Sequence, residues 1–332
     1  AVASWLEQQF EPQTSMAILS RNCAHWIMAD LAAISSGNVT IPLFTTLPLE
    51  TAEYILDFAE VEVIFLGQSE NWESIKAAVP ERVKVITLPG TDTDAAFSSW
   101  DSIVEEAKGR QPAWRCQHDE LVSLVFTSGT TGMPKGAMQT HDSMLLPAAR
   151  FGLAFNLRDN PRFLSYLPLS HIAERQLVEI QSMILHGTID FNESLATLSR
   201  DMHDTRPNFF FGAPRVWEQL QQGVLATMGS QQALDQMLAA DPAALGAAIR
   251  DKLGLNETDY LLSAAAPIST SLVAWFEKLG IVIMEGYGQT EAMGLIANRA
   301  GERKVGTIGK SDPSVEIRLS EEGELQVRAE GL

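Results

Sequence analysis

Cysteine and positive charge are both scarce in this chain of 332 residues. The two cysteines, Cys23 and Cys116, lie far apart and form no C-x-x-C pair, so the sequence predicts no disulfide framework and favours a reducing compartment. Lys and Arg total 24 against 42 Asp and Glu, which gives a formal net charge of −18. Sequence-independent nucleic-acid binding needs a basic surface, so no nucleic-acid partner is expected.

Long apolar runs are missing as well. No run reaches the ~18 residues that a membrane-spanning helix requires, and no signal peptide is visible. We therefore expect a cytoplasmic protein, and only a local basic patch would give it peripheral contact with an anionic membrane. The chain begins at Ala1 without Met, inside a predicted helix over Val2–Phe10, so N-terminal targeting cannot be read from it. The oligomeric state is left open, with a homodimer as one option.

Composition and element order predict an α/β protein. Hydrophobic residues make up 45% of the chain and charged residues 20%, as in ordinary globular proteins. Short β-rich runs alternate with longer helical patterns, which indicates βα units on a parallel sheet. The expected strands are Met16–Leu19, Val39–Leu43, Glu62–Leu66, Val83–Leu88, Leu121–Phe126, Phe163–Tyr166, Phe209–Phe211, Tyr260–Leu262 and Ile281–Met284. The expected helices include Ala24–Ser35, Leu49–Ala59, Ser143–Phe151, Arg175–His186 and Pro214–Met228.

Two further segments depart from this alternation. Gly229–Gly254, rich in Ala and Gln, is predicted to form surface helices of an insertion without a direct chemical role. Val315–Leu319 and Glu324–Arg328 alternate strictly in polarity on either side of a short turn. They predict an antiparallel hairpin at the start of a small barrel.

The most informative segment follows the expected strand Leu121–Phe126. It consists of Thr127, Ser128, Gly129, Thr130, Thr131, Gly132, Met133, Pro134, Lys135 and Gly136. Backbone N–H groups, hydroxyls and one lysine together suit a polyanion such as a triphosphate. The segment differs from a P-loop, because Pro134 prevents a helix from starting there. The alternative is a flexible linker, which would need neither the preceding strand nor the single lysine.

A second segment of this kind runs from Gly286 to Glu291. Its glycines allow close backbone approach to a ligand. Tyr287 offers a flat face for a purine, Thr290 a hydroxyl for a phosphate oxygen, and Glu291 a carboxylate for Mg²⁺. The alternative is a turn with an exposed glutamate and a core tyrosine. Both segments follow expected strands, and ligands in open α/β sheets bind beyond the carboxyl ends of strands.

These segments resemble signatures of the adenylate-forming (AMP-binding) superfamily, which includes acyl-CoA synthetases, luciferases and the adenylation domains of peptide synthetases. Residues 127–136 are similar to its phosphate loop T-S-G-T-T-G-x-P-K-G, and residues 287–291 to its Y-G-x-T-E signature. Leu167–Arg175 resembles the L-P-L-x-H-x-x-E-R form of long-chain fatty acyl-CoA synthetases, and Phe211–Glu218 resembles their V-P-R-V-x-E segment. Bacterial long-chain fatty acid–CoA ligases are the branch that the chain is most similar to.

The resemblance implies a role for each matching residue. ATP would be bound by the loop residues Thr127, Ser128, Gly129, Thr130, Thr131, Gly132 and Lys135, by Ala264 and Ala265, and by Glu285, Gly286, Tyr287, Gly288 and Thr290. Thr127 and Glu291 would share Mg²⁺. The catalytic residues would be Lys135, Thr290, Glu291 and His171, with His171 near the carboxylate. A lone histidine after a strand is more often structural, which is the alternative for His171.

The resemblance also implies a fold: the large N-terminal domain of an adenylate-forming enzyme, with two sheet-plus-helix subdomains and the start of a small β-barrel. Residues 23–199 would form the first subdomain with the phosphate loop, residues 1–22 and 200–300 the second, and residues 301–332 the partial barrel. The family's small C-terminal domain, with its catalytic lysine, and the Asp that binds ribose have no counterpart in the sequence.

The implied reaction has two steps. A carboxylate, expected to be a long-chain fatty acid, attacks the α-phosphorus of ATP to give an acyl-adenylate and pyrophosphate, and the thiol of coenzyme A then displaces AMP. One alternative is an aryl- or amino-acid-activating enzyme, although spacing locates no Asp for an α-amino group. Another is a non-catalytic nucleotide-binding module, against which the intact Lys135 and Glu291 argue.

Overall fold

The computed structural model describes residues 1–92, 97–127 and 132–332. The chain divides into two compact units, and each is described by itself. Residues 1–144 and 167–175 form the first unit, and residues 145–166 and 176–332 form the second.

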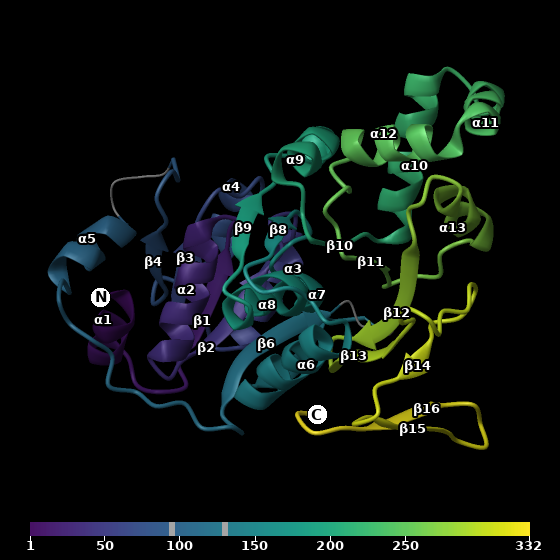
Figure 1. Ribbon diagram of the computed structural model, residues 1–332. Coiled ribbons are helices and arrows are strands. Elements are labelled where there is room, and N and C mark those ends of the chain that lie inside the picture. The colour runs from purple at the N-terminus through teal and green to yellow at the C-terminus, as the bar shows by residue number, and fades with distance from the viewer. Residues whose placement is uncertain (93–96, 128–131) are drawn as a thin grey trace. The chain divides into compact units, whose positions relative to one another are not determined.

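A seven-stranded sheet with the order β5-β4-β3-β1-β2-β6-β7 forms the centre of the first unit (Figure 1). β7 runs antiparallel to β6, and the other strands pair in parallel. The strands are β1 (Ser15–Leu19), β2 (Val39–Leu43), β3 (Val63–Leu66), β4 (Lys84–Thr87), β5 (Ser98–Ser99), β6 (Leu121–Thr127) and β7 (Lys135–Thr140). The helices are α1 (Val2–Gln9), α2 (Ala24–Ser35), α3 (Leu49–Phe58), α4 (Trp72–Ile75), η1 (Lys76–Ala78), α5 (Trp100–Glu106) and α7 (Ile172–Glu174).

Helices cover both faces of this sheet. Ala17, Leu19 and Ile41 lie in a buried apolar cluster that residues of α3 and α4 complete. Met16 and Ile18, which are also fully buried, point to the opposite face, because side chains alternate along a strand. α2 packs on β1 and β2. Burial on both faces is typical of a parallel sheet and confirms the predicted α/β class.

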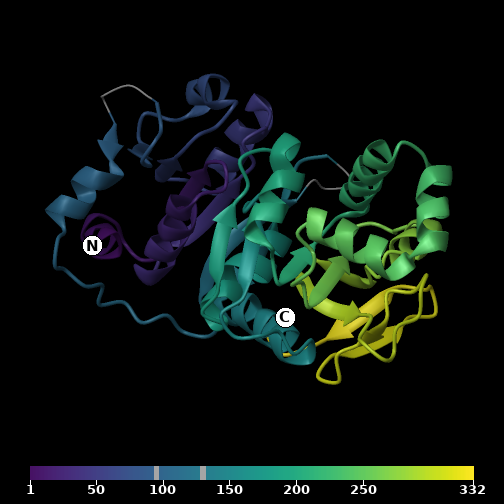
Figure 2. The same ribbon diagram turned by 45° about the horizontal axis from the view of Figure 1, so that its top comes forward.

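The second unit is built on a five-stranded sheet with the order β10-β11-β12-β13-β14 (Figures 1 and 2). β10, β11 and β12 are parallel, and β13 and β14 pair antiparallel. The strands, with two smaller sheets β8–β9 and β15–β16, are β8 (Arg162–Ser165), β9 (Thr188–Phe191), β10 (Phe209–Phe211), β11 (Tyr260–Ser263), β12 (Ile283–Gln289), β13 (Ala292–Ala297), β14 (Lys310–Ser311), β15 (Glu316–Leu319) and β16 (Leu325–Arg328). The remaining helices are α6 (His141–Ala154), η2 (Arg175–Ile180), α8 (Gln181–Ile184), η3 (Leu195–Thr197), α9 (Leu198–Thr205), α10 (Pro214–Met228), α11 (Gln231–Ala240), α12 (Pro242–Lys252) and α13 (Thr270–Glu277).

The core of the second unit joins its sheet to α10, α11, α12 and α13. Trp217 of α10 lies between Phe210 and Phe276, with ring centroids 5.5 and 5.3 Å away. The helices predicted within Gly229–Gly254 are present, but Leu234 and Ile249 are buried in this core. These helices are therefore part of the packing of the unit and not only surface additions.

The predicted subdomain boundaries need correction. β1 lies between β3 and β2 in the first sheet, so residues 1–22 belong to the first unit and not to the second. Residues 145–166 and 176–199, expected in the first subdomain, group with the second unit. These placements depend on pairing between distant segments, which spacing along the chain does not reveal. The hairpin expected near the C-terminal end is confirmed as β15 and β16.

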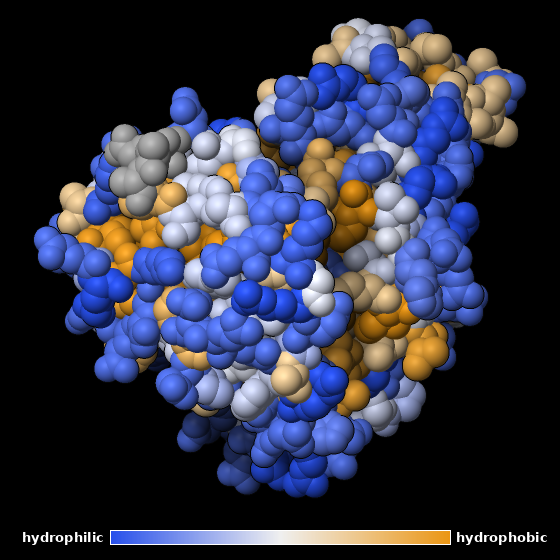
Figure 3. All heavy atoms as spheres, turned by 90° about the vertical axis from the view of Figure 1, so that its left-hand side faces the viewer, coloured by the Kyte–Doolittle hydropathy of each residue, from blue (hydrophilic) through white to orange (hydrophobic). Residues whose placement is uncertain are grey.

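Polar side chains dominate the part of the surface drawn in Figure 3. Figure 3 shows one face of the molecule, which is mostly hydrophilic and has smaller apolar areas between the polar side chains. Within the described residues, no helix combines the length and the apolar character that crossing a membrane would need.

Candidate functional site

The predicted phosphate loop connects two paired strands. β6 ends at Thr127, β7 begins at Lys135, and these two residues are partners in the antiparallel ladder. Thr127 Oγ1 also donates a hydrogen bond to the Lys135 carbonyl oxygen at 3.5 Å. A hairpin therefore holds the two ends of the loop side by side, and a strand rather than a helix follows Pro134. Ser128, Gly129, Thr130 and Thr131 lie outside the described residues.

The described end of this loop leaves its cation accessible. Lys135 is exposed. Gly132 has a φ of +129°, a backbone conformation that favours glycine. A Cβ atom on Gly136 would lie 3.3 Å from the ring of Phe126, so this glycine allows the hairpin to pack closely. The two glycines thus shape the backbone, while the ammonium group of Lys135 is free to contact an anion.

In the second unit, the ends of two neighbouring strands bring predicted nucleotide residues together. Ser263, the last residue of β11, pairs with Glu285 of β12. Ala264 and Ala265 follow Ser263 directly, so they lie next to Gly286 at the carboxyl edge of the sheet. Ala265 is exposed and has a φ of +70°, which is rare for alanine. Such strained residues cluster at ligand sites, which favours a functional role for this turn.

The segment expected to be a loop after Met284 is instead part of a hairpin. β12 continues through Gln289, and Tyr287 is half-buried opposite Ile296 of β13. Thr290 and Glu291 form the turn at the tip. Glu291 is exposed, and within the parts of the chain that the structure describes it forms no hydrogen bond or ion pair. Its carboxylate is therefore open to a ligand.

Glu285 has a structural contact that the sequence did not suggest. Its side chain is buried, and Oε2 accepts a hydrogen bond from the Gly306 backbone N–H at 3.0 Å. Its carbonyl oxygen accepts the Asn298 N–H at 2.8 Å. Glu285 thus ties β12 to the segment around residue 306. Its contact with a nucleotide stays a prediction.

His171 occupies the start of α7 in the first unit. Its Nδ1 accepts a hydrogen bond from the Ala173 backbone N–H at 3.1 Å, which makes His171 the N-cap of this short helix. The neutral ring consequently carries its proton on Nε2, which can donate to a ligand. Desolvation lowers the pKa of His171 below the ordinary value of 6.5, although the residue keeps an exposed edge. Near neutral pH the ring is therefore an uncharged donor.

Two anchors, both missed by sequence reasoning, fix the segment that carries His171. Asn22 donates to the Leu167 carbonyl oxygen at 2.6 Å and accepts the Leu169 N–H at 2.9 Å. At the other end, Arg175 Nη2 contacts both carboxylate oxygens of Asp30 at 2.7 and 2.6 Å, and both side chains are buried. In the sequence, only the Arg at the end of the L-P-L-x-H-x-x-E-R pattern pointed to such an anchor. Its partner Asp30 lies on α2, 145 residues earlier in the chain.

The structure therefore gathers the predicted residues in two places. Thr127, Lys135 and His171 belong to the first unit, and Glu291 with the residues of β11 and β12 belongs to the second. The shared binding of Mg²⁺ by Thr127 and Glu291 stays a prediction.

The chain is thus an α/β protein with two units. In each unit the predicted polar segments lie at the ends of strands. The chain belongs to the family of AMP-binding enzymes, which matches residues 1–331. This membership confirms the resemblance drawn from the phosphate loop and the Tyr287–Glu291 segment.

Similar proteins cover most of the chain. It is 26% identical over 374 residues to the long-chain-fatty-acid–CoA ligase heimdall of Drosophila melanogaster, which covers 96% of this chain and 54% of the relative. It is 26% identical over 349 residues to the long-chain-fatty-acid–CoA ligase FadD15 of Mycobacterium bovis, with 94% and 57% covered. The chain thus spans about half the length of these curated relatives.

Solved structures confirm the fold. The N-terminal domain of FACL13 from Mycobacterium tuberculosis matches with a TM-score of 0.75 and 22% identity, over 98% of this chain and 76% of that one. The anthranilate CoA ligase AuaEII matches with a TM-score of 0.79 and 21% identity, over 99% of this chain and 63% of that one. The predicted fold, an N-terminal domain of an adenylate-forming enzyme, is confirmed.

Proposed function

We propose that this chain binds ATP with Mg²⁺ and activates a long-chain fatty acid as an acyl-adenylate, before a thioester forms with coenzyme A. An oxygen of the fatty-acid carboxylate bonds to the α-phosphorus of ATP, and pyrophosphate leaves. The thiol of coenzyme A loses its proton, its sulfur bonds to the acyl carbon, and AMP leaves. Family membership and the long-chain ligases among the relatives support this proposal.

The observation that carries the proposal is the exposed Lys135 at the end of a hairpin-held loop. The strand pairing fixes the backbone of Lys135, and its flexible side chain can bring the ammonium group to phosphate charge. Neither step requires a protein nucleophile. The rate enhancement is therefore expected to come from positioning the reactants and neutralising phosphate charge. Ala265, Gly286 and Tyr287 would lie beside the adenine.

The residues present fit Mg²⁺ as a partner of the nucleotide. Mg²⁺ is usually bound through one or two carboxylates together with substrate phosphates and water. Glu291 supplies one exposed carboxylate, and among the described residues no cluster of three His, Cys, Asp or Glu side chains forms a metal cage. When bound, Mg²⁺ would neutralise phosphate charge. Thr127 would add a hydroxyl oxygen.

His171 is proposed to orient the fatty-acid carboxylate. Because Nδ1 is occupied by the Ala173 N–H, only Nε2–H is available to donate to a carboxylate oxygen. Losing a hydrogen bond to a charged group is worth about 1.5–3 kcal/mol, so we expect a tenfold to hundredfold loss in fatty-acid use. His171→Asn keeps an acceptor for the helix cap and removes Nε2–H, and the amide N–H groups of the shorter asparagine do not reach its position.

The test measures binding and adenylation separately on this chain. Calorimetry should detect binding of ATP–Mg²⁺. Palmitate with α-labelled ATP should give a labelled acyl-adenylate only slowly, because the family's catalytic lysine has no counterpart in this sequence. Glu291→Gln should lower adenylate formation from every carboxylate by about 10²-fold, with partial recovery at high Mg²⁺. His171→Asn should weaken the response to palmitate and leave ATP binding unchanged. Glu322→Gln, in the exposed turn between β15 and β16, is the matched control.

Three results would contradict parts of the proposal. Folded protein that releases no heat with millimolar ATP–Mg²⁺ would favour a different ligand. Adenylate formation from benzoate or an amino acid but not from palmitate would favour the aryl- or amino-acid-activating alternative. Equal loss of ATP binding in the Glu291 and His171 variants would make His171 a structural residue.

A further inference from the structure

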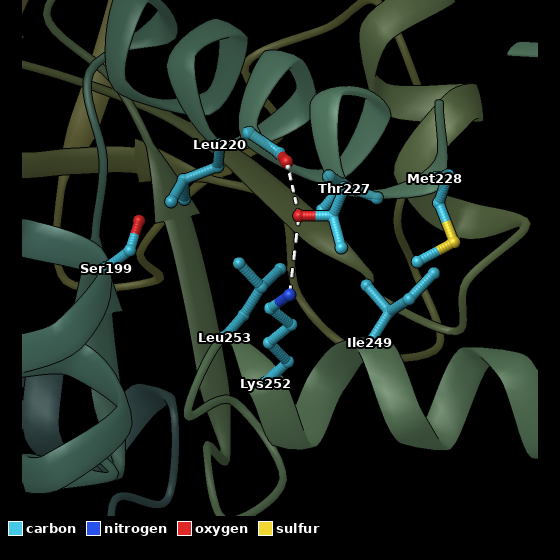
Figure 4. Close-up of a pocket in the computed structure, with 9 residues that line it drawn as sticks. Ser199, Leu220, Thr227, Met228, Ile249, Lys252 and Leu253 are labelled. Atoms are coloured by element: carbon cyan, nitrogen blue, oxygen red, sulfur yellow. Dashed lines mark hydrogen bonds between the residues drawn. The ribbon is translucent and has the colours of Figure 1, made fainter. Parts of the chain in front are cut away.

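A small apolar cavity lies between α9, α10 and α12 of the second unit (Figure 4). Its volume is about 130 Å³, and its walls include Leu220, Val224, Met228, Ile249 and Leu253. An apolar protein cavity of about 150 Å³ holds one benzene molecule. This cavity is slightly smaller, so it can hold an aliphatic group of at most about six carbons.

The position of the cavity separates it from the strand ends described above. α10 begins at Pro214, just beyond the carboxyl end of β10, and Gly223 lies further along the same helix. At 1.5 Å per residue, Gly223 is about 14 Å along the axis from Pro214. α12 ends at Lys252, shortly before β11 begins at Tyr260. The cavity thus lies toward the amino-terminal ends of these strands.

Gly223 leaves one wall of the cavity open. It lies inside α10, where glycine lowers helix stability relative to alanine. A Cβ atom built on Gly223 would meet no other atom within 4 Å. Neither packing nor a left-handed backbone explains glycine at this position. Gly223 is exposed and lines the cavity, so its absent side chain leaves open space at the rim of the cavity.

A positive charge lies at the rim of the same cavity. Figure 4 shows Lys252 of α12 reaching toward Thr227 of α10, where Nζ donates to Oγ1 at 3.3 Å. Thr227 Oγ1 in turn donates to the Gly223 carbonyl oxygen at 3.0 Å. Within the described ranges Lys252 forms no ion pair. The adjacent carboxylate of Asp251 is paired with Arg206 at 3.3 Å. In a chain of net charge −18, an ammonium group without a carboxylate partner can bind an external anion.

We propose that this cavity binds an aliphatic monocarboxylate of about six carbons, as a second site distinct from the proposed adenylation site. The alkyl chain occupies the space beside Gly223 and contacts Val224 and Ile249. The carboxylate contacts Lys252 Nζ at the rim. Volume sets the length of the chain, and the charge of Lys252 selects an anion over a neutral or cationic group of the same size.

The test is a titration of this chain with hexanoate, followed through methyl NMR signals. The methyl groups of Met228 and Ile249, which line the cavity, should shift and saturate. Hexylamine, with the same alkyl length and the opposite charge, should shift them at least tenfold less effectively. The exposed Met28, which belongs to the first unit, serves as an internal control and should not shift.

Two pairs of variants test the assignment. Gly223→Leu fills the cavity and should abolish the saturable shifts, whereas Ala226→Leu, exposed on the same helix outside the lining, should keep them. Lys252→Met should raise the apparent Kd by about threefold to tenfold, and Lys278→Met should leave it unchanged. Lys252 is exposed, so its variant tests the proposal even if Gly223→Leu unfolds the protein. No saturation at Met228 and Ile249, or an unchanged Kd in Lys252→Met, would overturn the proposal.

Discussion

Asp30→Ala should destabilise the first unit by about 3–5 kcal/mol, because it leaves a buried guanidinium without its counter-charge. Arg175 is 0% exposed at its side chain and Asp30 3%. Arg175 Nη2 contacts both Asp30 oxygens, and Nη1 donates to Ser123 Oγ at 2.8 Å. Ser123 Oγ donates onward to the Thr40 carbonyl oxygen at 2.9 Å. The arginine thus joins α2, β6 and the segment that carries His171.

Two further variants separate the effect of the uncompensated Arg175 charge from that of its hydrogen bond to Ser123. Ser123→Ala removes one hydrogen bond from the charged guanidinium and should cost about 1.5–3 kcal/mol. The double variant Asp30→Leu/Arg175→Met removes both charges and should be less destabilised than Asp30→Ala, since replacing a buried pair by apolar groups is often near neutral. This ordering distinguishes an uncompensated charge from a simple loss of packing.

Urea unfolding at pH 7, followed by tryptophan fluorescence, measures these differences. Trp26 lies 5.7 Å from the Arg175 guanidinium carbon and reports on the site. Asp57→Ala, an exposed acidic residue of α3 in the same unit, is the control and should stay within about 0.5 kcal/mol of the parent chain. A cost below about 1 kcal/mol for Asp30→Ala, or a double variant less stable than the single one, would refute the reasoning.

Two further predictions concern stability. Gly309 has a φ of +93°, and a Cβ there would lie 2.1 Å from the Ala297 carbonyl carbon, so Gly309→Ala should cost about 3–5 kcal/mol in thermal unfolding. Gly301→Ala, with a φ of +81° and no atom within 4 Å, should cost only about 1–2 kcal/mol, and equal costs would contradict the clash. Because the folded pKa of His171 lies below 6.5, the unfolded state binds more protons, and stability should fall as pH decreases from about 7.5 to 5. His171→Asn should reduce this fall in urea titrations, and an unchanged pH dependence would refute the assignment.

Local patterns predicted most of the buried parallel strands and the C-terminal hairpin, but they missed β7 and the continuation of β12. Val39–Leu43 and Phe209–Phe211 were predicted with their observed bounds, because apolar runs identify strands buried on both faces. β7 was not predicted, since Lys135–Thr140 has no apolar alternation and is a strand only through its pairing with β6. The segment from Gly286 to Glu291 was expected to follow the strand, yet β12 continues through Gln289, with Gly286 paired to Ala297 of β13 and Gly288 in a bulge. Pairing between chain segments overrode intrinsic propensity in both cases.

The candidate site was predictable where one segment contains the whole motif. The loop ends at Thr127 and Lys135 and the turn at Glu291 follow from contiguous residues, and the structure leaves Lys135 and Glu291 exposed. The partners Asp30 and Arg175 are 145 residues apart, and no spacing rule joins them. Ala265 is a similar case, because its positive φ depends on how β11 leads into the following turn.

The L-P-L-x-H-x-x-E-R segment shows why a shared motif does not assign one role to all its residues. Leu167 and Leu169 are anchored through Asn22, and Arg175 is anchored through Asp30, whereas His171 between them keeps an exposed edge. If the proposed function holds, substituting Arg175 would lower fatty-acid use by moving this segment, although its guanidinium bonds to the buried Asp30 and Ser123. Substituting His171 by Asn would leave these anchors and the helix cap intact. A loss of activity alone therefore does not identify a residue that contacts the carboxylate, whereas a loss at His171 with unchanged stability does.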